Sequence, residues 1–253
     1  MNLSNNSLPT PGARRHLWAV LLAGGDGTRL RDLTSRIAGD DRPKQFCPII
    51  GAESLLSQTR ARLDPLFPGD RQVFVVSRAH ETYYSKELAD ARDSLVLAQP
   101  MNRGTAVGII IALVHVMQAD PDAIVGFFPC DHHYSDDDSF RSIVRSATSS
   151  AEEFPGSLVI VGAQAEYAET EYGWIEPTAR LLSSSCDVVL WVTRALADND
   201  LAPTYARLQS VDFSRDVPAH QANRRLVLRD SGSGWADLGS PDRVLGLLAK
   251  NFN

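Results

Sequence analysis

Near its N-terminus the chain contains the glycine-rich run Leu21-Leu22-Ala23-Gly24-Gly25-Asp26-Gly27-Thr28-Arg29-Leu30. The apolar residues 17–22 that lead into it predict a buried strand. Its three glycines let the backbone turn tightly where that strand ends, and they leave backbone N–H groups exposed. Because such a turn wraps closely around phosphate groups, the stretch predicts a strand followed by a phosphate-binding loop.

A second run, Arg42-Pro43-Lys44-Gln45-Phe46, follows the glycine loop. Arg29 and Lys44 supply cationic donors for the negative charge of a departing pyrophosphate. Two other glycine motifs do not fit. A Walker loop needs Lys and then Ser or Thr directly after its last glycine, and a dinucleotide-binding fingerprint needs a glycine where Leu30 stands. For the glycines alone, an ordinary strand-to-helix turn remains an alternative.

Together, the two segments resemble the signature of the sugar-1-phosphate nucleotidyltransferases, an L-A-G-G-x-G-T-R-L loop with a P-K-Q-F segment behind it. Within that family they are most similar to the mannose-1-phosphate guanylyltransferases (GDP-mannose pyrophosphorylases). The resemblance implies transfer of a nucleotide from a nucleoside triphosphate, with GTP favoured, to a sugar 1-phosphate such as mannose 1-phosphate. The residues that it implies for nucleotide binding are Leu22, Ala23, Gly24, Gly25, Gly27, Thr28, Arg29, Lys44, Arg103 and Thr105.

Composition sets outer limits on the function. The chain has 253 residues, of which 43% are hydrophobic, enough for one large domain or two small ones. With 25 basic residues against 31 acidic ones, the charge balance argues against general nucleic-acid binding. Three cysteines, Cys47, Cys130 and Cys186, lack metal-ligand spacing and cannot all pair, which indicates a reducing, cytoplasmic setting.

The N-terminus imitates a signal peptide, because Arg14-Arg15 precedes a short apolar run. We reject that interpretation, since the run continues into the glycine loop and the residues before it are polar. Residues 1–13 are expected to form a disordered tail, and residues 14–253 a single domain. The longest apolar stretch, 107–117, is shorter than the ~20 residues that a membrane helix needs, so no membrane association is expected.

Strands and helices are predicted to alternate along the chain. Continuous Val, Ile and Phe runs favour a doubly wound, mostly parallel, Rossmann-like α/β sheet with helices on both faces. In such a sheet, ligands gather at the carboxyl ends of the strands. The predicted strands are 17–22, 72–77, 94–98, 123–128 and 157–162, and the predicted helices are 54–66, 81–91, 105–118 and 139–152. The run Asp136-Asp137-Asp138 is expected to cap the last of these helices rather than to bind metal.

Two aspartates are candidate Mg²⁺ ligands. Asp131 lies directly beyond a predicted strand, in a run that resembles the family's P-x-D-H motif, and Asp237 lies in a segment that resembles its W-x-D-x-G motif. The resemblance implies that both hold the metal and that Asp131 is catalytic together with Arg29 and Lys44. For each aspartate, a turn or capping role is the alternative. His132 is assigned to substrate contact, because no third zinc ligand has suitable spacing.

Two further segments resemble the family with departures. Residues 99–106 resemble its E-P-x-x-R-N-T-A run near the base, but Gln99 replaces the acid and Gly104 replaces Asn. Thr105 is then also a candidate helix cap. Residues 172–176 resemble a Y-G-Y-I-E segment that approaches the sugar, although a plain strand with a glycine bulge is equally consistent. The sugar-binding residues implied are His132, Tyr172, Gly173 and Glu176.

The resemblance breaks after Glu176. The family's Glu-Lys-Pro and Trp-Asn-x-Gly segments are absent, so the sugar-binding part is shortened around 177–204, with an apparent internal deletion near Cys186. Two alternatives therefore stay open: a catalytically impaired nucleotide-binding or regulatory relative, and transfer to another sugar phosphate from dTTP, UTP or ATP. A missing strand would also expose a sheet edge, which a second copy of the chain would cover in a homo-oligomer.

Overall fold

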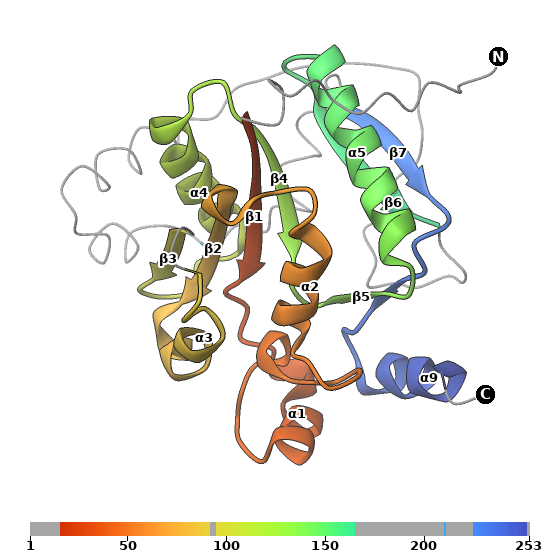
Figure 1. Ribbon diagram of the computed structural model, residues 1–253. Coiled ribbons are helices and arrows are strands. Elements are labelled where there is room, and N and C mark those ends of the chain that lie inside the picture. Colours follow the sequence, from red (N-terminus) through yellow and green to blue (C-terminus); the bar gives the residue numbers. More distant parts are fainter. Residues whose placement is uncertain (1–15, 92–94, 165–209, 211–224, 252–253) are drawn as a thin grey trace.

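Four parallel strands form the central sheet, in the order β3-β2-β1-β4. A computed structural model describes residues 16–91, 95–164, 210 and 225–251 (Figure 1). The strands are β1 (Leu17–Ala23), β2 (Gln72–Ser77), β3 (Leu95–Gln99) and β4 (Ile124–Pro129). Each lies within one residue of its predicted position, and all three strand pairs are parallel, which confirms the predicted sheet type.

Helices cover both faces of this sheet, as predicted. Alternate residues of β1 point to opposite faces, since side chains in a strand alternate with period two. On one face, the odd-numbered residues of β1 (17, 19, 21 and 23) pack with α2 (Leu55–Leu63) and α5 (Asp137–Glu153). On the other, Trp18 and Val20 pack with Ala112 and Val116 of α4 (Thr105–Ala119). Figure 1 shows the sheet flanked in this way.

The ends of the helices follow local side-chain chemistry. Asp136 caps α5, because its carboxylate accepts hydrogen bonds from the backbone nitrogens of Asp138 (3.0 Å) and Ser139 (2.9 Å). This confirms the capping role predicted for the acidic run. The cap predicted at Thr105 is wrong: the helix begins at Thr105, and Gly104 occupies the cap position with φ of 83°. A positive φ suits glycine, which explains this departure from the family's Asn.

Two small sheets lie beside the central one. β5 (His132–Tyr134) pairs antiparallel with β8 (Trp235–Asp237), and β6 (Leu158–Ala163) pairs in parallel with β7 (Arg225–Asp230). Among the described residues, β6 therefore pairs with β7 rather than extending the central sheet, which corrects the prediction for 157–162. The remaining elements are α1 (Arg31–Ala38), α3 (Glu81–Glu87), α9 (Pro241–Asn251), η2 (Thr28–Leu30), η3 (Lys44–Phe46), η4 (Gly69–Arg71) and η5 (Arg78–His80).

A second, smaller core joins the two ends of the described chain. Leu30, Leu238 and Val244 are almost fully buried in one cluster, against which Leu247 and Leu248 of α9 also pack. This cluster fixes α9 near the segment that follows the glycine loop. Of the helices that the structure describes, none has the length and apolar character needed to cross a bilayer.

Candidate active site

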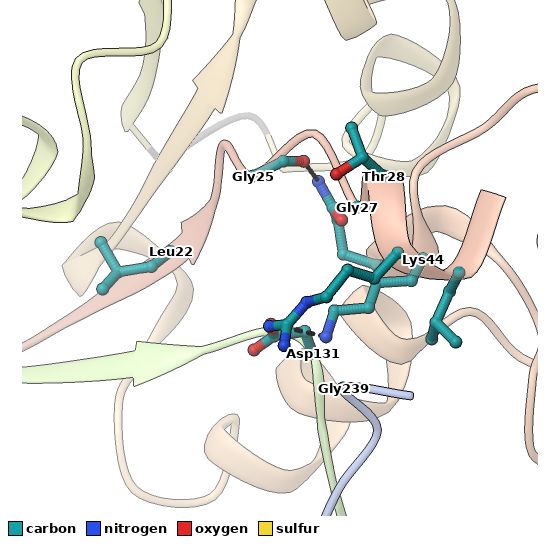
Figure 2. Close-up of a pocket in the computed structure, with 10 residues that line it drawn as sticks. Leu22, Gly25, Gly27, Thr28, Lys44, Asp131 and Gly239 are labelled. Atoms are coloured by element: carbon teal, nitrogen blue, oxygen red, sulfur yellow. Dashed lines mark hydrogen bonds and ion pairs between the residues drawn. The ribbon is translucent and has the colours of Figure 1, made fainter. Parts of the chain in front are cut away.

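The carboxyl ends of β1 and β4 meet at a cavity of about 230 Å³. Cys130 donates its backbone N–H to the carbonyl of Leu22 (3.2 Å), which carries the strand pairing on to the residue before Asp131. Seven predicted site residues line the cavity, namely Leu22, Gly25, Gly27, Thr28, Arg29, Lys44 and Asp131 (Figure 2). The structure thus brings the glycine loop, the Lys44 segment and the end of β4 together, as the sequence predicts.

Gly27 allows the loop to approach the Lys44 segment closely. Its φ is 61°, in the left-handed region that disfavours residues with a Cβ. A Cβ at this position would stand 3.0 Å from the backbone nitrogen of Lys44. Both facts explain why the turn needs glycine here, and they place the start of η3 directly against the loop.

Gln45 fixes the shape of the glycine loop through hydrogen bonds to its backbone. Its buried side-chain amide donates hydrogen bonds to the carbonyls of Ala23 (2.9 Å) and Gly25 (2.8 Å), the second of which is drawn in Figure 2. Two carbonyls, on either side of Gly24, are thereby held in place, so the loop is braced before any ligand arrives. Gln45 was not among the predicted site residues, although it stands directly after Lys44 in the sequence.

Lys44 and Asp131 form an ion pair inside the cavity. The ammonium lies 3.0 Å from the Asp131 carboxylate and donates to the carbonyl of Leu238 at 3.3 Å (Figure 2). Desolvation favours the protonated acid, but the charges of His132 and Lys44 outweigh it, so the pKa of Asp131 lies below its ordinary value. The carboxylate is therefore ionised at neutral pH, as a metal ligand must be.

Asp237 reaches the same region through strand pairing. In the β5–β8 ladder, Asp237 stands opposite His132, which makes it a neighbour of Asp131. Its carboxylate is bonded by the guanidinium of Arg243 from α9. A Cβ at Gly239, which lines the cavity, would stand 2.8 Å from that carboxylate, so Asp237 lies just behind the cavity wall.

The pair of carboxylates fits Mg²⁺. This ion commonly uses one or two protein carboxylates and completes its shell with water and substrate phosphates. Asp131, which lines the cavity, and Asp237, just behind its wall, supply such a pair. Among the described residues, no group of three or more His, Cys, Asp or Glu side chains is arranged to hold a metal ion.

His132 is oriented by a neighbouring indole. Trp235 Nε1 donates to His132 Nδ1 (3.2 Å), so a neutral ring carries its proton on Nε2. That nitrogen lies 3.8 Å from the carboxylate of Asp131. The structure therefore directs His132 toward Asp131, and its predicted contact with sugar stays a prediction.

The segment that opens α4 touches the glycine loop without lining the cavity. Asn102 donates to the carboxylate of Asp26 at 3.0 Å, and a Cβ at Gly24 would stand 2.9 Å from the amide of Gln99. These contacts place Arg103 and Thr105 near the loop, outside the cavity lining. Tyr172, Gly173, Glu176 and the interval 177–204 fall outside the described residues.

Comparison with known proteins agrees with this geometry. The chain is 32% identical over 185 residues to a mannose-1-phosphate guanylyltransferase of Sinorhizobium fredii, covering 70% of the chain and 34% of that protein. It is 29% identical over 196 residues to the xanthan biosynthesis protein XanB of Xanthomonas campestris, covering 77% of the chain and 39% of that protein. The chain thus spans between a third and two fifths of the length of these relatives.

Solved structures share the fold. A protein described as mannose-1-phosphate geranyltransferase from Thermus thermophilus matches with a TM-score of 0.73 and 23% identity, over 88% of this chain and 76% of that one. A protein described as a glucose-1-phosphate thymidylyltransferase from Bacillus anthracis matches with a TM-score of 0.58 and 13% identity, over 94% of this chain and 96% of that one. A protein-family model for nucleotidyl transferases matches residues 18–186. Because that match extends over more than half of the sequence, the chain belongs to the nucleotidyl transferase family.

Proposed function

We propose that this chain joins a nucleoside triphosphate to a sugar 1-phosphate, releasing pyrophosphate and a nucleotide sugar, with GTP and mannose 1-phosphate as the preferred pair. The observation that carries the proposal is the ion pair of Lys44 and Asp131, 3.0 Å apart inside the cavity that the glycine loop lines. A phosphate-binding cation and a candidate metal carboxylate share one site. The preference for GTP and mannose 1-phosphate rests on relatives named mannose-1-phosphate guanylyltransferase at about 30% identity.

The chemistry needs positioning and charge neutralisation more than a covalent enzyme nucleophile. A phosphate oxygen of the sugar attacks the α-phosphorus while pyrophosphate leaves in line. The backbone N–H groups of the glycine loop hold the triphosphate, and Arg29 and Lys44 line the same cavity, where they stabilise the charge of the leaving pyrophosphate. The brace at Gln45 keeps the loop in its binding shape.

Asp131 and Asp237 would hold Mg²⁺ in this reaction. When bound, the ion neutralises charge on the phosphate oxygens. Asp131 is ionised at neutral pH, as the lowering of its pKa indicates. His132, which Trp235 orients, lies 3.8 Å from that carboxylate. Tyr172, Gly173 and Glu176 are proposed to face the sugar.

A second function is favoured by one feature of the sequence. The Glu-Lys-Pro and Trp-Asn-x-Gly segments that the family uses beyond Glu176 are absent, so sugar phosphate would lose a charge partner. A chain of this kind would bind the nucleotide and act as a regulatory relative with little turnover. The same departure leaves room for a different sugar phosphate or for dTTP, UTP or ATP.

A substrate panel separates these functions. GTP, dTTP, UTP and ATP are each mixed with several sugar 1-phosphates in the presence of Mg²⁺, and pyrophosphate release is measured. Under the main proposal, GTP with mannose 1-phosphate gives the highest rate, and Asp131→Asn lowers it roughly 100-fold or more. Asp138→Asn, which changes an aspartate that pairs with Arg141 on α5, serves as the matched control and keeps the rate.

Each outcome decides between the functions. GTP-dependent thermal stabilisation without product from any sugar phosphate supports the regulatory function. A higher rate with another pair reassigns the substrates but keeps the reaction. An unchanged rate in Asp131→Asn would remove the metal assignment.

A further inference from the structure

We propose that Arg243 is an exchangeable counter-ion of Asp237, which makes the site bind metal together with triphosphate rather than metal alone. The inference rests on the proposed function, because it concerns the same metal site. Its starting point is that the guanidinium of Arg243 donates to the Asp237 carboxylate in a place where both side chains are mostly buried, with exposed fractions of 11% and 18%.

Anchoring of α9 does not require this ion pair. Val244, the next residue on the helix, is fully buried against Leu30 and Leu238, and Leu247 and Leu248 pack on the same cluster. Apolar burial of this extent holds a helix in place by itself. The ion pair is therefore not the sole anchor of α9, and it places a positive charge on the Asp237 carboxylate.

Both candidate metal ligands are neutralised in this arrangement. Lys44 pairs with Asp131 and Arg243 pairs with Asp237, so two positive charges face two negative ones. A divalent cation that arrives alone must displace at least one of these cations and leave it without its partner in a partly buried site, which is unfavourable. A triphosphate that arrives with the metal gives the displaced cations new anionic partners.

The position of Arg243 suits such an exchange. A Cβ at Gly239, a residue of the cavity wall, would stand 2.8 Å from the Nη1 atom of Arg243. The guanidinium therefore lies just behind the cavity wall at Gly239, beside the Asp237 carboxylate. The proposed exchange is a change of its rotamer from carboxylate to phosphate, without movement of α9. Because binding free energies are reciprocal, metal then raises triphosphate affinity by the same factor by which triphosphate raises metal affinity.

The test uses Mn²⁺ as the probe metal. Two dissociation constants are measured by calorimetry and by the Mn²⁺ paramagnetic resonance signal: that of Mn²⁺ alone, and that of Mn²⁺ with a non-hydrolysable GTP analogue. The variants are Arg243→Gln and Arg243→Met, which keep the stem without the charge, and Arg243→Lys, which keeps a cation. Arg141→Gln removes an arginine that pairs with Asp138 on α5 and is the matched control.

The two constants are expected to move in opposite directions. Without the Arg243 charge, Mn²⁺ alone binds about tenfold more tightly, the size expected for loss of one charge-assisted hydrogen bond to its ligand. The Mn²⁺–analogue complex binds several-fold more weakly, because the triphosphate loses a cation. Arg243→Lys and Arg141→Gln keep both constants close to the wild-type values.

Three results would overturn the inference. The first is an unchanged or weaker affinity for Mn²⁺ alone in both neutral variants, and the second is movement of both constants in the same direction, as a structural role predicts. The third is that neither the wild type nor any variant binds Mn²⁺, with or without the GTP analogue, which would refute the proposed metal site itself. If instead no pyrophosphate is released but the neutral variants still bind Mn²⁺ more tightly, the proposed function fails while the role of Arg243 stands.

Discussion

Replacing Gln45 with Met tests the hydrogen bonds that hold the glycine loop in shape. Met has a similar length and fits an apolar environment, so the substitution removes two hydrogen bonds with little change in volume. The lost bonds are those from the amide to the carbonyls of Ala23 (2.9 Å) and Gly25 (2.8 Å). Since the side chain is only 3% exposed, water does not readily replace the amide.

The expected loss of stability follows from these two bonds. A net contribution of about 0.5–1.5 kcal/mol for each gives a decrease of ~1–3 kcal/mol in the free energy of unfolding. The loop also loses its fixed shape, and the triphosphate must then order it on binding. If ~1–2 kcal/mol of that ordering appears in the binding free energy, GTP affinity falls roughly 5–30-fold.

Gln58 provides the matched control. Its amide likewise donates to two carbonyls, those of Ile50 (2.7 Å) and Glu53 (2.9 Å), and neither residue lines the cavity. Urea unfolding and GTP titration are measured for Gln45→Met and Gln58→Met. Both variants lose stability, but only Gln45→Met loses GTP affinity. Equal affinities in the two variants would refute the idea that Gln45 shapes the phosphate loop.

Two further predictions concern a glycine and a buried acid. Gly27→Ala places a Cβ 3.0 Å from the backbone nitrogen of Lys44 at a residue with positive φ, so it weakens GTP binding at least about tenfold. Gly39→Ala is the control: its φ is also positive, but the space around it is open. That variant loses only ~1 kcal/mol of stability and keeps its affinity for GTP. Asp120 accepts hydrogen bonds from His16 and Trp18, and they lower its pKa against the effect of burial. Because its pKa is lower in the folded state, the Asp120 carboxylate stabilises the fold above about pH 4. This stabilisation is lost as the pH falls through the pKa of the folded state. Asp120→Asn should therefore lower the unfolding free energy at pH 7 and flatten its decline in acid, which denaturation at a series of pH values measures.

The central sheet could be predicted because its signals are local. The apolar runs of β1, β2 and β4 are long and bounded by polar or turn residues, so each strand was placed within one residue. The pairing of β6 with β7 could not be predicted, because the strand pattern of Leu158–Ala163 gives its period but not its partner. Partner choice depends on contacts far apart in the sequence.

The site, too, could be predicted where its signals are local and not where it depends on contacts in the folded chain. Gly27 and Asp131 follow predicted strands, and general rules for parallel sheets bring the carboxyl ends of such strands together. Lys44 was predicted from the motif in which it stands. Arg243 gave no signal, because an arginine near the start of an amphipathic helix is typical of a solvated surface. Its proposed role follows from its ion pair with Asp237, a residue that the pairing of β5 with β8 sets opposite His132.

The phosphate-binding part and the proposed metal-binding part of the site therefore depend on different contacts, the first within one stretch of sequence and the second between distant segments. The phosphate half is built within one stretch, where Gln45 braces a loop that begins at Ala23. The half that we propose for metal joins segments far apart in the chain. Lys44 donates a hydrogen bond to the carbonyl of Leu238, 194 residues away, and β5 pairs with β8 through a ladder of three residue pairs. A short ladder contributes few hydrogen bonds, so its geometry depends more on the charges around it. Pairing both carboxylates with cations stabilises that half until a substrate brings charges of its own, which is the physical reason to expect metal and triphosphate to bind together.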